Sequence, residues 1–246
     1  MRLLVLLILF LNLLVQNQSS DSILDGQMTN RQQIDSIPTI SKNFLLGKFD
    51  YRKDDRFIKV DAKFCSKEIW LQKKVYEAYV KMYVAAIKEG IELKILSGTR
   101  NFYEQKWIWE RKWKSYSNLK PKDRAIKILE YSSMPSTSRH HWGTDLDLVS
   151  LSPKFFKSTK GQKVHNWIQN NANRYGFYQV YTSDPNRKGY QEEPWHWTYL
   201  PLSQAYLQAY NKEVDYGDFK GFQGSRLAKE LKVIDHFVNG VNKRIQ

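Results

Sequence analysis

Cysteine is almost absent from this sequence, which has one such residue, Cys65, among 246. A single cysteine cannot form an internal disulfide, so the fold must be stabilised by a buried core. The chain is long enough to bury such a core in one ordinary domain with extensions. Its composition therefore excludes the small extracellular scaffolds that depend on disulfides.

Long hydrophobic runs are also scarce. The run Leu3–Val15 follows Met1-Arg2 and is shorter than the roughly 20 residues that span a bilayer. A short basic segment followed by an apolar one is typical of a secretory signal, which we place at residues 1–20, with an uncleaved membrane anchor as the alternative. Residues 21–42 are polar and are interpreted as a linker. Export without disulfides favours a bacterial periplasm or cell envelope.

Negative charge is in deficit, because 39 Lys and Arg face 25 Asp and Glu, for a formal net charge of +14. This balance favours anionic surroundings such as nucleic acid, anionic lipid or acidic wall polymers. We expect no nucleic-acid partner, since the chain has no dense basic run and no nucleic-acid-binding motif. Peripheral membrane association fits the charge, and we expect a monomer.

The hydrophobic periodicity predicts an α+β fold, in which a small antiparallel sheet is flanked by helices and carries the site in a cleft. The catalytic domain is placed at residues 43–211 and a C-terminal helical extension at 212–246. Short extended pieces are expected at 44–46 and 57–60. Helices are expected over 66–89, after Asn101 (whose spacing to Glu104 is that of a capping box), and over 121–131, 160–174, 202–210 and 226–239. Strands are expected over 91–96, 144–149, 177–181 and 195–199.

Histidine is another rare residue, with five in the chain. Two of them lie beside two carboxylates in the stretch Ser138-Arg139-His140-His141-Trp142-Gly143-Thr144-Asp145-Leu146-Asp147, and a third ends the downstream stretch Glu193-Pro194-Trp195-His196. Catalytic zinc takes three protein ligands of these types and leaves one position open. His140, Asp147 and His196 would supply them from a loop and two strands. His141 in place of His140, and Asp145 in place of Asp147, stay open on spacing alone.

Glu193 stands three residues before His196, a spacing that puts the two side chains on opposite faces of a regular strand. Pro194 restricts its neighbour and cannot donate a ladder hydrogen bond, so a local irregularity is expected there. With that irregularity, Glu193 could reach a zinc-bound water and act as its general base.

These motifs resemble the VanY-type D-alanyl-D-alanine carboxypeptidases, within the zinc peptidases that include LD-carboxypeptidases. The resemblance covers roughly residues 88–199. It rests on Ser138-x-His140-x-x-Gly143-x-x-x-Asp147, on Glu193-x-Trp195-His196, and on the upstream Ser97-Gly98-Thr99-Arg100 with Gln105, which is similar to the family's Ser-Gly-Tyr-Arg segment. Thr99 departs from that segment.

The resemblance implies the zinc ligands His140, Asp147 and His196, with Glu193 as catalytic base. Arg100 would bind the substrate's carboxylate or the developing oxyanion, as a permanently charged guanidinium can. The remaining implied positions would bind substrate or form hydrogen bonds near the site, and they are Ser138, Gln105 and Asp145. Asp145 stands where the family often has Ala, and its added carboxylate could hold a ligand histidine or select a cationic part of the substrate.

The expected function is therefore that of an exported zinc-dependent carboxypeptidase, which hydrolyses D-alanine-terminated peptidoglycan stem peptides. An endopeptidase of the same fold is one alternative, and a non-catalytic wall-binding module is another. Glu193 favours an enzyme, because a binding module needs no base. The tryptophans in the motifs could line the cleft, but a place in the core is favoured for Trp142, Trp195 and Trp197.

Overall fold

The computed structural model describes residues 40–246, which fold as one unit. The predicted signal at 1–20 and most of the linker at 21–42 therefore lie outside the described residues. Within residues 40–246, no helix combines the length and apolar character needed to cross a membrane.

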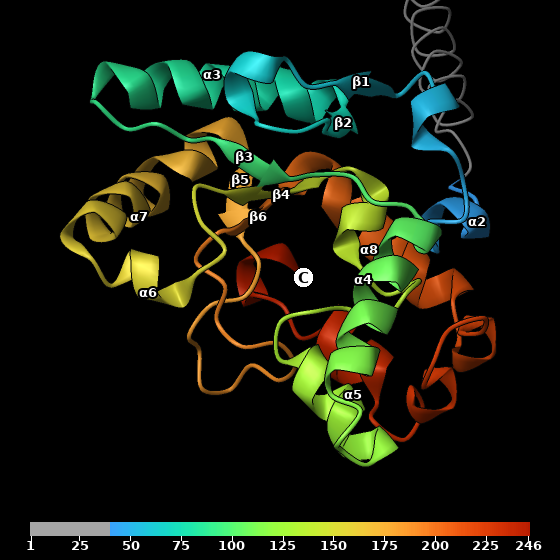
Figure 1. The fold of residues 1–246 in the computed structure, drawn as a ribbon. Helices are drawn as coiled ribbons and strands as arrows, with labels where there is room; N and C mark the ends of the chain where they lie inside the picture. The colour runs from blue at the N-terminus through green and yellow to red at the C-terminus, as the bar shows by residue number, and fades with distance from the viewer. Residues whose placement is uncertain (1–39) are drawn as a thin grey trace, which may run out of the picture. The chain divides into compact units, whose positions relative to one another are not determined.

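A four-stranded sheet lies at the centre of the fold (Figure 1). Its strand order is β3-β4-β6-β5, and each neighbouring pair is antiparallel. The strands are β3 (Ile95–Ser97), β4 (Asp145–Leu148), β6 (His196–Tyr199) and β5 (Phe177–Gln179). A second, two-stranded sheet pairs β1 (Phe57–Lys59) with β2 (Trp70–Gln72). The predicted α+β class with a small antiparallel sheet is confirmed.

Helices surround this sheet, with α6 and α7 to one side in Figure 1 and α4, α5 and α8 to the other. The longer helices are α3 (Lys73–Lys88), α4 (Phe102–Ser115), α5 (Pro121–Leu129), α7 (Thr159–Asn171) and α8 (Leu200–Glu213). Two single-turn helices are α2 (Lys42–Leu45) and α6 (Pro153–Phe156). Short 3-10 turns lie at Tyr51–Lys53, Ala62–Phe64, Arg139–Trp142, Ala172–Tyr175, Tyr216–Asp218, Ser225–Leu227 and Lys243–Ile245, and a π-helical turn at Ile234–Val238.

The alternation along β4 decides which face of the sheet carries chemistry. Leu146 and Leu148 are fully buried and belong to the core formed with α3 and α7, where they meet residues such as Met82. Successive strand residues point to opposite faces, so Asp145 and Asp147 point away from that core. The predicted division of this strand into a leucine face and a carboxylate face is confirmed.

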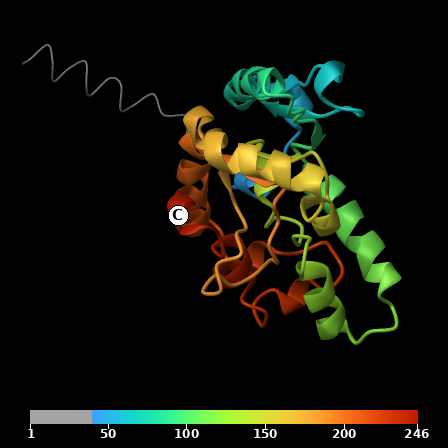
Figure 2. The same ribbon diagram turned by 90° about the vertical axis from the view of Figure 1, so that its left-hand side faces the viewer.

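A second core joins the two ends of the described chain. It includes Phe44 in α2, Trp109 in α4 and, from the C-terminal extension, Phe222 and Val238. Part of the C-terminal extension lies beside α4 and α5 (Figures 1 and 2), and there the Trp109 indole donates to the carbonyl of Gln223 at 2.8 Å. Residues 212–246 are therefore part of the same hydrophobic core as the helices of the catalytic domain.

The start of α4 follows its predicted capping box. Asn101 Oδ1 accepts from the Glu104 amide at 3.0 Å, and Glu104 Oε2 accepts from the Asn101 amide at 2.8 Å. These two bonds satisfy donors that a helix otherwise leaves free at its N-terminus. They fix the backbone of Asn101, directly after Arg100, in the segment between β3 and α4.

Two predicted elements are wrong, and a third has the wrong start. The helix expected from Ser66 begins only at Lys73, because the preceding residues pair as β2 with β1. The helix expected over 226–239 is broken into short turns, and Lys232 between them has a φ of +50°, which an α-helix cannot accommodate. The segment 44–46 is helical or turn and not extended, since its capped first turn packs into the core.

Candidate active site

The metal-ligand candidates meet on the polar face of the sheet. Asp147 on β4 is directly opposite His196 on β6 in the strand register. His140 comes from the 3-10 turn that precedes β4, and this turn ends at Gly143, whose φ of +69° favours glycine. A Cβ at Gly143 would also lie 2.3 Å from the Phe57 ring. The three side chains offer one donor atom each, all within 4.8 Å of one another and all buried.

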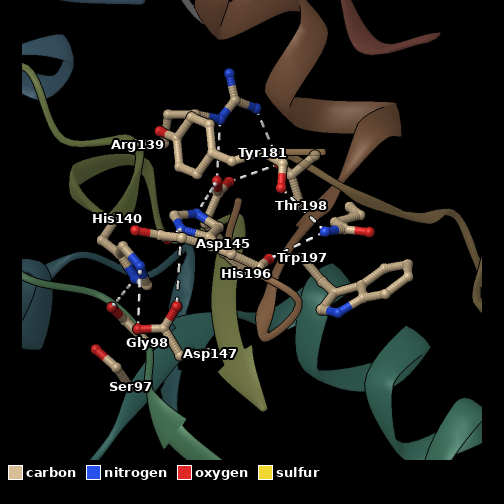
Figure 3. Close-up of polar contacts among 12 residues, drawn as sticks. Ser97, Gly98, Arg139, His140, Asp145, Asp147, Tyr181, His196, Trp197 and Thr198 are labelled. Carbon is tan, nitrogen blue, oxygen red and sulfur yellow. Dashed lines mark hydrogen bonds and ion pairs between the residues drawn. The ribbon is translucent and has the colours of Figure 1, made fainter. Parts of the chain in front are cut away.

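The two histidines present opposite ring nitrogens to Asp147 (Figure 3). The Nδ1 atom of His140 lies 2.7 Å from the Gly98 carbonyl, which can only accept, so its Nε2 is free to face Asp147 Oδ2 at 3.5 Å. In His196 it is Nδ1 that faces Asp147 Oδ1, at 3.7 Å.

Asp147 Oδ1 is buried and has no hydrogen-bond partner among the residues that the structure describes. Buried polar atoms are almost always satisfied, so this oxygen indicates a missing ligand. Two imidazoles and one carboxylate are also the donor types of catalytic zinc sites. The residues present therefore fit a metal ion.

Burial and neighbouring charge act against each other in this cluster. Burial alone would raise the pKa of Asp147, but His140, His196 and Arg100 outweigh it and lower that pKa to about 2. Burial would lower the pKa of His196, whereas its hydrogen bonds to Asp145 and Glu193 raise it to about 10. The neighbouring charges therefore outweigh burial at both side chains.

Glu193 reaches the cluster through a turn. The His196 amide donates to the Glu193 carbonyl at 3.2 Å, and Glu193 Oε2 lies 3.0 Å from His196 Nδ1. The predicted irregularity at Pro194 is confirmed. Burial raises the pKa of Glu193, and the hydrogen bond to His196 opposes that rise. The Glu193 carboxylate thus lies beside Nδ1 of His196, the ring atom that faces the metal position. A general base for a metal-bound water must lie close to that position.

Arg100 is held beside the cluster by its neighbours. Its Nε donates to Gln105 Oε1 at 3.0 Å, its Nη1 donates to the Ser97 hydroxyl, and Nη1 lies 3.9 Å from Asp147 Oδ2. The Gln105 amide also donates to the Ser133 carbonyl at 2.8 Å. Gln105 lines the cleft, and its contacts show that it orients the guanidinium.

His141 is excluded as a metal ligand. Its Nδ1 contacts the Arg100 carbonyl at 2.7 Å, and its Nε2 accepts from the Ser136 amide at 3.1 Å. Both ring nitrogens are therefore committed to the backbone, and burial lowers the pKa of His141 to about 3. Ser138 is also buried, does not line the cleft, and its hydroxyl has no partner within residues 40–246.

The prediction that Asp145 binds substrate is wrong. Asp145 is fully buried and does not line the cleft. The reason is that its strand position points it beneath His196, where its Oδ2 lies 2.9 Å from His196 Nε2. Of the two roles considered for this added carboxylate, the structure places it against the ligand histidine.

The cluster lies in a cleft of about 590 Å³. Sequence reasoning missed much of its wall, which includes Trp107, Lys112, Tyr131 and Leu151. Three of these are exposed apolar residues, with 62% of Trp107 accessible. Helical spacing shows which residues share a face of a helix, but it does not show whether that face borders a cleft. The core interpretation is confirmed for Trp142 and Trp197, while Trp195 is buried and also borders the cleft.

Comparisons with known proteins identify the family of the chain. Residues 68–202 match the family model VanY, described as D-alanyl-D-alanine carboxypeptidase. YodJ of Bacillus subtilis (strain 168), provisionally named a carboxypeptidase, is 30% identical over 191 residues, which cover 74% of this chain and 66% of YodJ. A D-alanyl-D-alanine carboxypeptidase of Enterococcus faecium is 28% identical over 176 residues, which cover 70% of this chain and 49% of that protein.

A solved structure has a similar fold. The LdcB LD-carboxypeptidase matches with a TM-score of 0.51 and 25% identity, over 68% of this chain and 77% of that one. The match to this chain spans between about half and two thirds of the length of the curated relatives above.

Proposed function

The chain belongs to the VanY family of D-alanyl-D-alanine carboxypeptidases, and from this premise we propose that it is a zinc-dependent carboxypeptidase that releases D-alanine from peptidoglycan stem peptides. One observation carries the proposal. His140, Asp147 and His196 converge within 4.8 Å at the base of a cleft, and Glu193 contacts the same histidine nitrogen that faces Asp147. A metal site with an adjacent base is the arrangement of a metallopeptidase.

Zinc is supported by the chemistry of the donors. Imidazole nitrogens and a single carboxylate suit Zn²⁺, whereas Mg²⁺ and Ca²⁺ prefer sites made of oxygen atoms. A zinc ion held by His140, Asp147 and His196 would act as a Lewis acid on the scissile carbonyl and acidify a water molecule. Glu193 would accept the proton of the attacking water and deliver it to the leaving amine.

Arg100 supplies positive charge where negative charge develops. Its guanidinium is fixed by Gln105 and Ser97 and lies against Asp147. A preorganised donor of this kind stabilises an oxyanion without reorganising during the reaction. Arg100 is therefore assigned to the reacting carbonyl, close to the ligand carboxylate.

Among the cations that line the cleft, which also include Lys67 and Arg111, we assign Lys112 to the substrate's terminal carboxylate. It lines the cleft from α4 and donates to the Ser132 hydroxyl. No carboxylate lies within ion-pair distance of Lys112 in the described part of the chain. Free donors on a partly buried ammonium favour an exopeptidase over an endopeptidase, because only the former needs to recognise a chain end.

Location forms part of the proposal. The Met1-Arg2 and Leu3–Val15 segments support export to the periplasm or cell envelope, and the net charge of +14 supports attraction to an acidic wall. We propose that the protein acts there as a monomer, associated with membrane or wall by charge.

The test is digestion of defined stem peptides, followed by mass spectrometry. A pentapeptide ending in D-Ala-D-Ala should lose one D-alanine, and a chelator should prevent this. The same peptide with a C-terminal amide should react much more slowly. Cleavage inside the stem would indicate the endopeptidase, and no cleavage would indicate a binding module.

Lys112→Met tests the exopeptidase assignment. It should raise KM for the free acid while leaving the rate on the amide unchanged, because only the free acid presents a carboxylate. Lys114→Met, an exposed change in the same last turn of α4, is the matched control. An equal loss on both peptides would contradict the role given to Lys112.

A further inference from the structure

Asp145 is a fully buried carboxylate with hydrogen bonds to both of its oxygens (Figure 3). Its Oδ2 lies 2.9 Å from His196 Nε2 and 3.0 Å from Arg139 Nε. Its Oδ1 accepts from the hydroxyls of Thr144 at 2.7 Å and Thr198 at 2.6 Å. His196 and Thr198 lie on β6, and Arg139 and Thr144 lie in the segment that leads into β4, so the network links two neighbouring strands of the sheet.

We infer that Asp145 is a positioning residue that selects which nitrogen of His196 binds the metal. An ionised carboxylate only accepts hydrogen bonds, so the nitrogen facing it must carry the proton. That nitrogen is Nε2. The lone pair of the ring is then on Nδ1, the atom that lies 3.0 Å from Glu193 and 3.7 Å from Asp147.

The second ligand histidine is fixed by the same principle with a weaker partner. His140 is held at Nδ1 by the neutral carbonyl of Gly98 and presents Nε2. The two rings thus turn opposite nitrogens toward one point, each fixed from behind. A carboxylate behind a ligand imidazole raises its basicity more than a carbonyl does, and such partners are worth about 10–100-fold in metal affinity.

Arg139 makes this buried carboxylate tolerable. Both side chains are almost inaccessible, at 1% for Arg139 and 0% for Asp145, and a lone charge at that depth would be strongly unfavourable. The guanidinium also donates to Thr198 at 3.0 Å and lies 4.9 Å from the centre of the Trp142 ring. The ion pair therefore adds a directed acceptor behind His196 without changing the net charge of the site.

This inference rests on the proposed function only in taking His196 as a metal ligand. It goes further in assigning the affinity of that ligand to two residues that do not touch the cleft. It also explains why Arg139 and Asp145 are only six residues apart, because the turn and the strand that carry the ligands His140 and Asp147 also carry the acceptor behind His196 and its counter-ion.

The test measures zinc affinity and not hydrolysis. Purified full chain is titrated with Zn²⁺ against a chromophoric chelator, for wild type, Asp145→Asn and Asp145→Ala. The dissociation constant should rise about 10–100-fold in Asp145→Ala. It should rise less in Asp145→Asn, because the amide oxygen still accepts from Nε2 but lacks the charge. Asp123→Asn, exposed on α5, makes the same charge change away from the site and should match wild type.

A double variant keeps the test valid if Asp145→Ala does not fold because Arg139 is left as an unpaired buried charge. Arg139→Met combined with Asp145→Ala removes both charges, should fold, and should bind zinc as weakly as the single variant. Wild-type affinity in the folded double variant, or in Asp145→Ala, would overturn the inference. A wild-type chain that binds no zinc at all would overturn the proposed function with it.

Discussion

Glu193→Gln tests the centre of the proposed mechanism. The substitution keeps the size and shape of a side chain that is only 5% exposed, so packing in the turn before β6 should persist. It removes the carboxylate that lies 3.0 Å from His196 Nδ1. A positioned general base contributes about 10²–10⁴ to the rate, which is about 3–5.5 kcal/mol of barrier at 1.36 kcal/mol for each factor of ten. We expect kcat to fall by that factor.

The assay is the release of D-alanine from a D-Ala-D-Ala peptide, run beside a measurement of bound zinc. Zinc content should stay near that of wild type, because His140, Asp147 and His196 are unchanged. Glu192→Gln is the matched control, since Glu192 is the adjacent, exposed carboxylate and does not line the cleft. Activity within about threefold of wild type in zinc-loaded Glu193→Gln would refute the base assignment, since a lost base removes at least about 10².

Three further substitutions and removal of the metal probe other parts of the molecule. Arg100→Met should lower kcat/KM about 10²–10³-fold, the usual loss of one oxyanion donor, with zinc retained; unchanged kinetics would exclude its role. Asn101→Ala removes the capping box of α4 and should cost about 1 kcal/mol, whereas Met82→Ala empties a fully buried position against the sheet and should cost about 2–5 kcal/mol. The free energy of unfolding of both variants is measured by denaturant titration. A transition midpoint equal to that of wild type would contradict the capping or the packing described. Chelation should abolish hydrolysis and lower the melting temperature, with Zn²⁺ restoring both.

Local rules in the sequence were enough to predict several parts of the site. The alternation in β4 separated Leu146 and Leu148 from the two carboxylates, and the Asn101 cap placed the start of α4. Pro194 indicated the turn that brings Glu193 to His196. Each of these features depends on residues close together in the chain, where backbone geometry leaves few choices.

The remaining features depend on contacts between distant segments. Spacing alone could not separate His140 from His141, because the choice depends on the backbone groups of Arg100 and Ser136 that take both nitrogens of His141. Nothing in the local pattern showed that Lys112 would line the cleft. The ion pair between Arg139 and Asp145 had one signal in the sequence. Arg139 is a cation six residues before this carboxylate, in a segment that is otherwise suited to burial.

The metal site can form only when β4 and β6 pair in the correct register. In the observed register Asp147 is opposite His196, and Asp145 is opposite Thr198, with Leu146 opposite Trp197 between them. Side chains alternate faces along a strand, so a slip of one residue in β4 would turn the leucines to the cleft and the carboxylates into the hydrophobic core. Such a misfolded sheet would have neither the third metal ligand nor the acceptor behind His196. Bound zinc would therefore stabilise only correctly paired chains, and metal stoichiometry would report the fraction of protein folded in register.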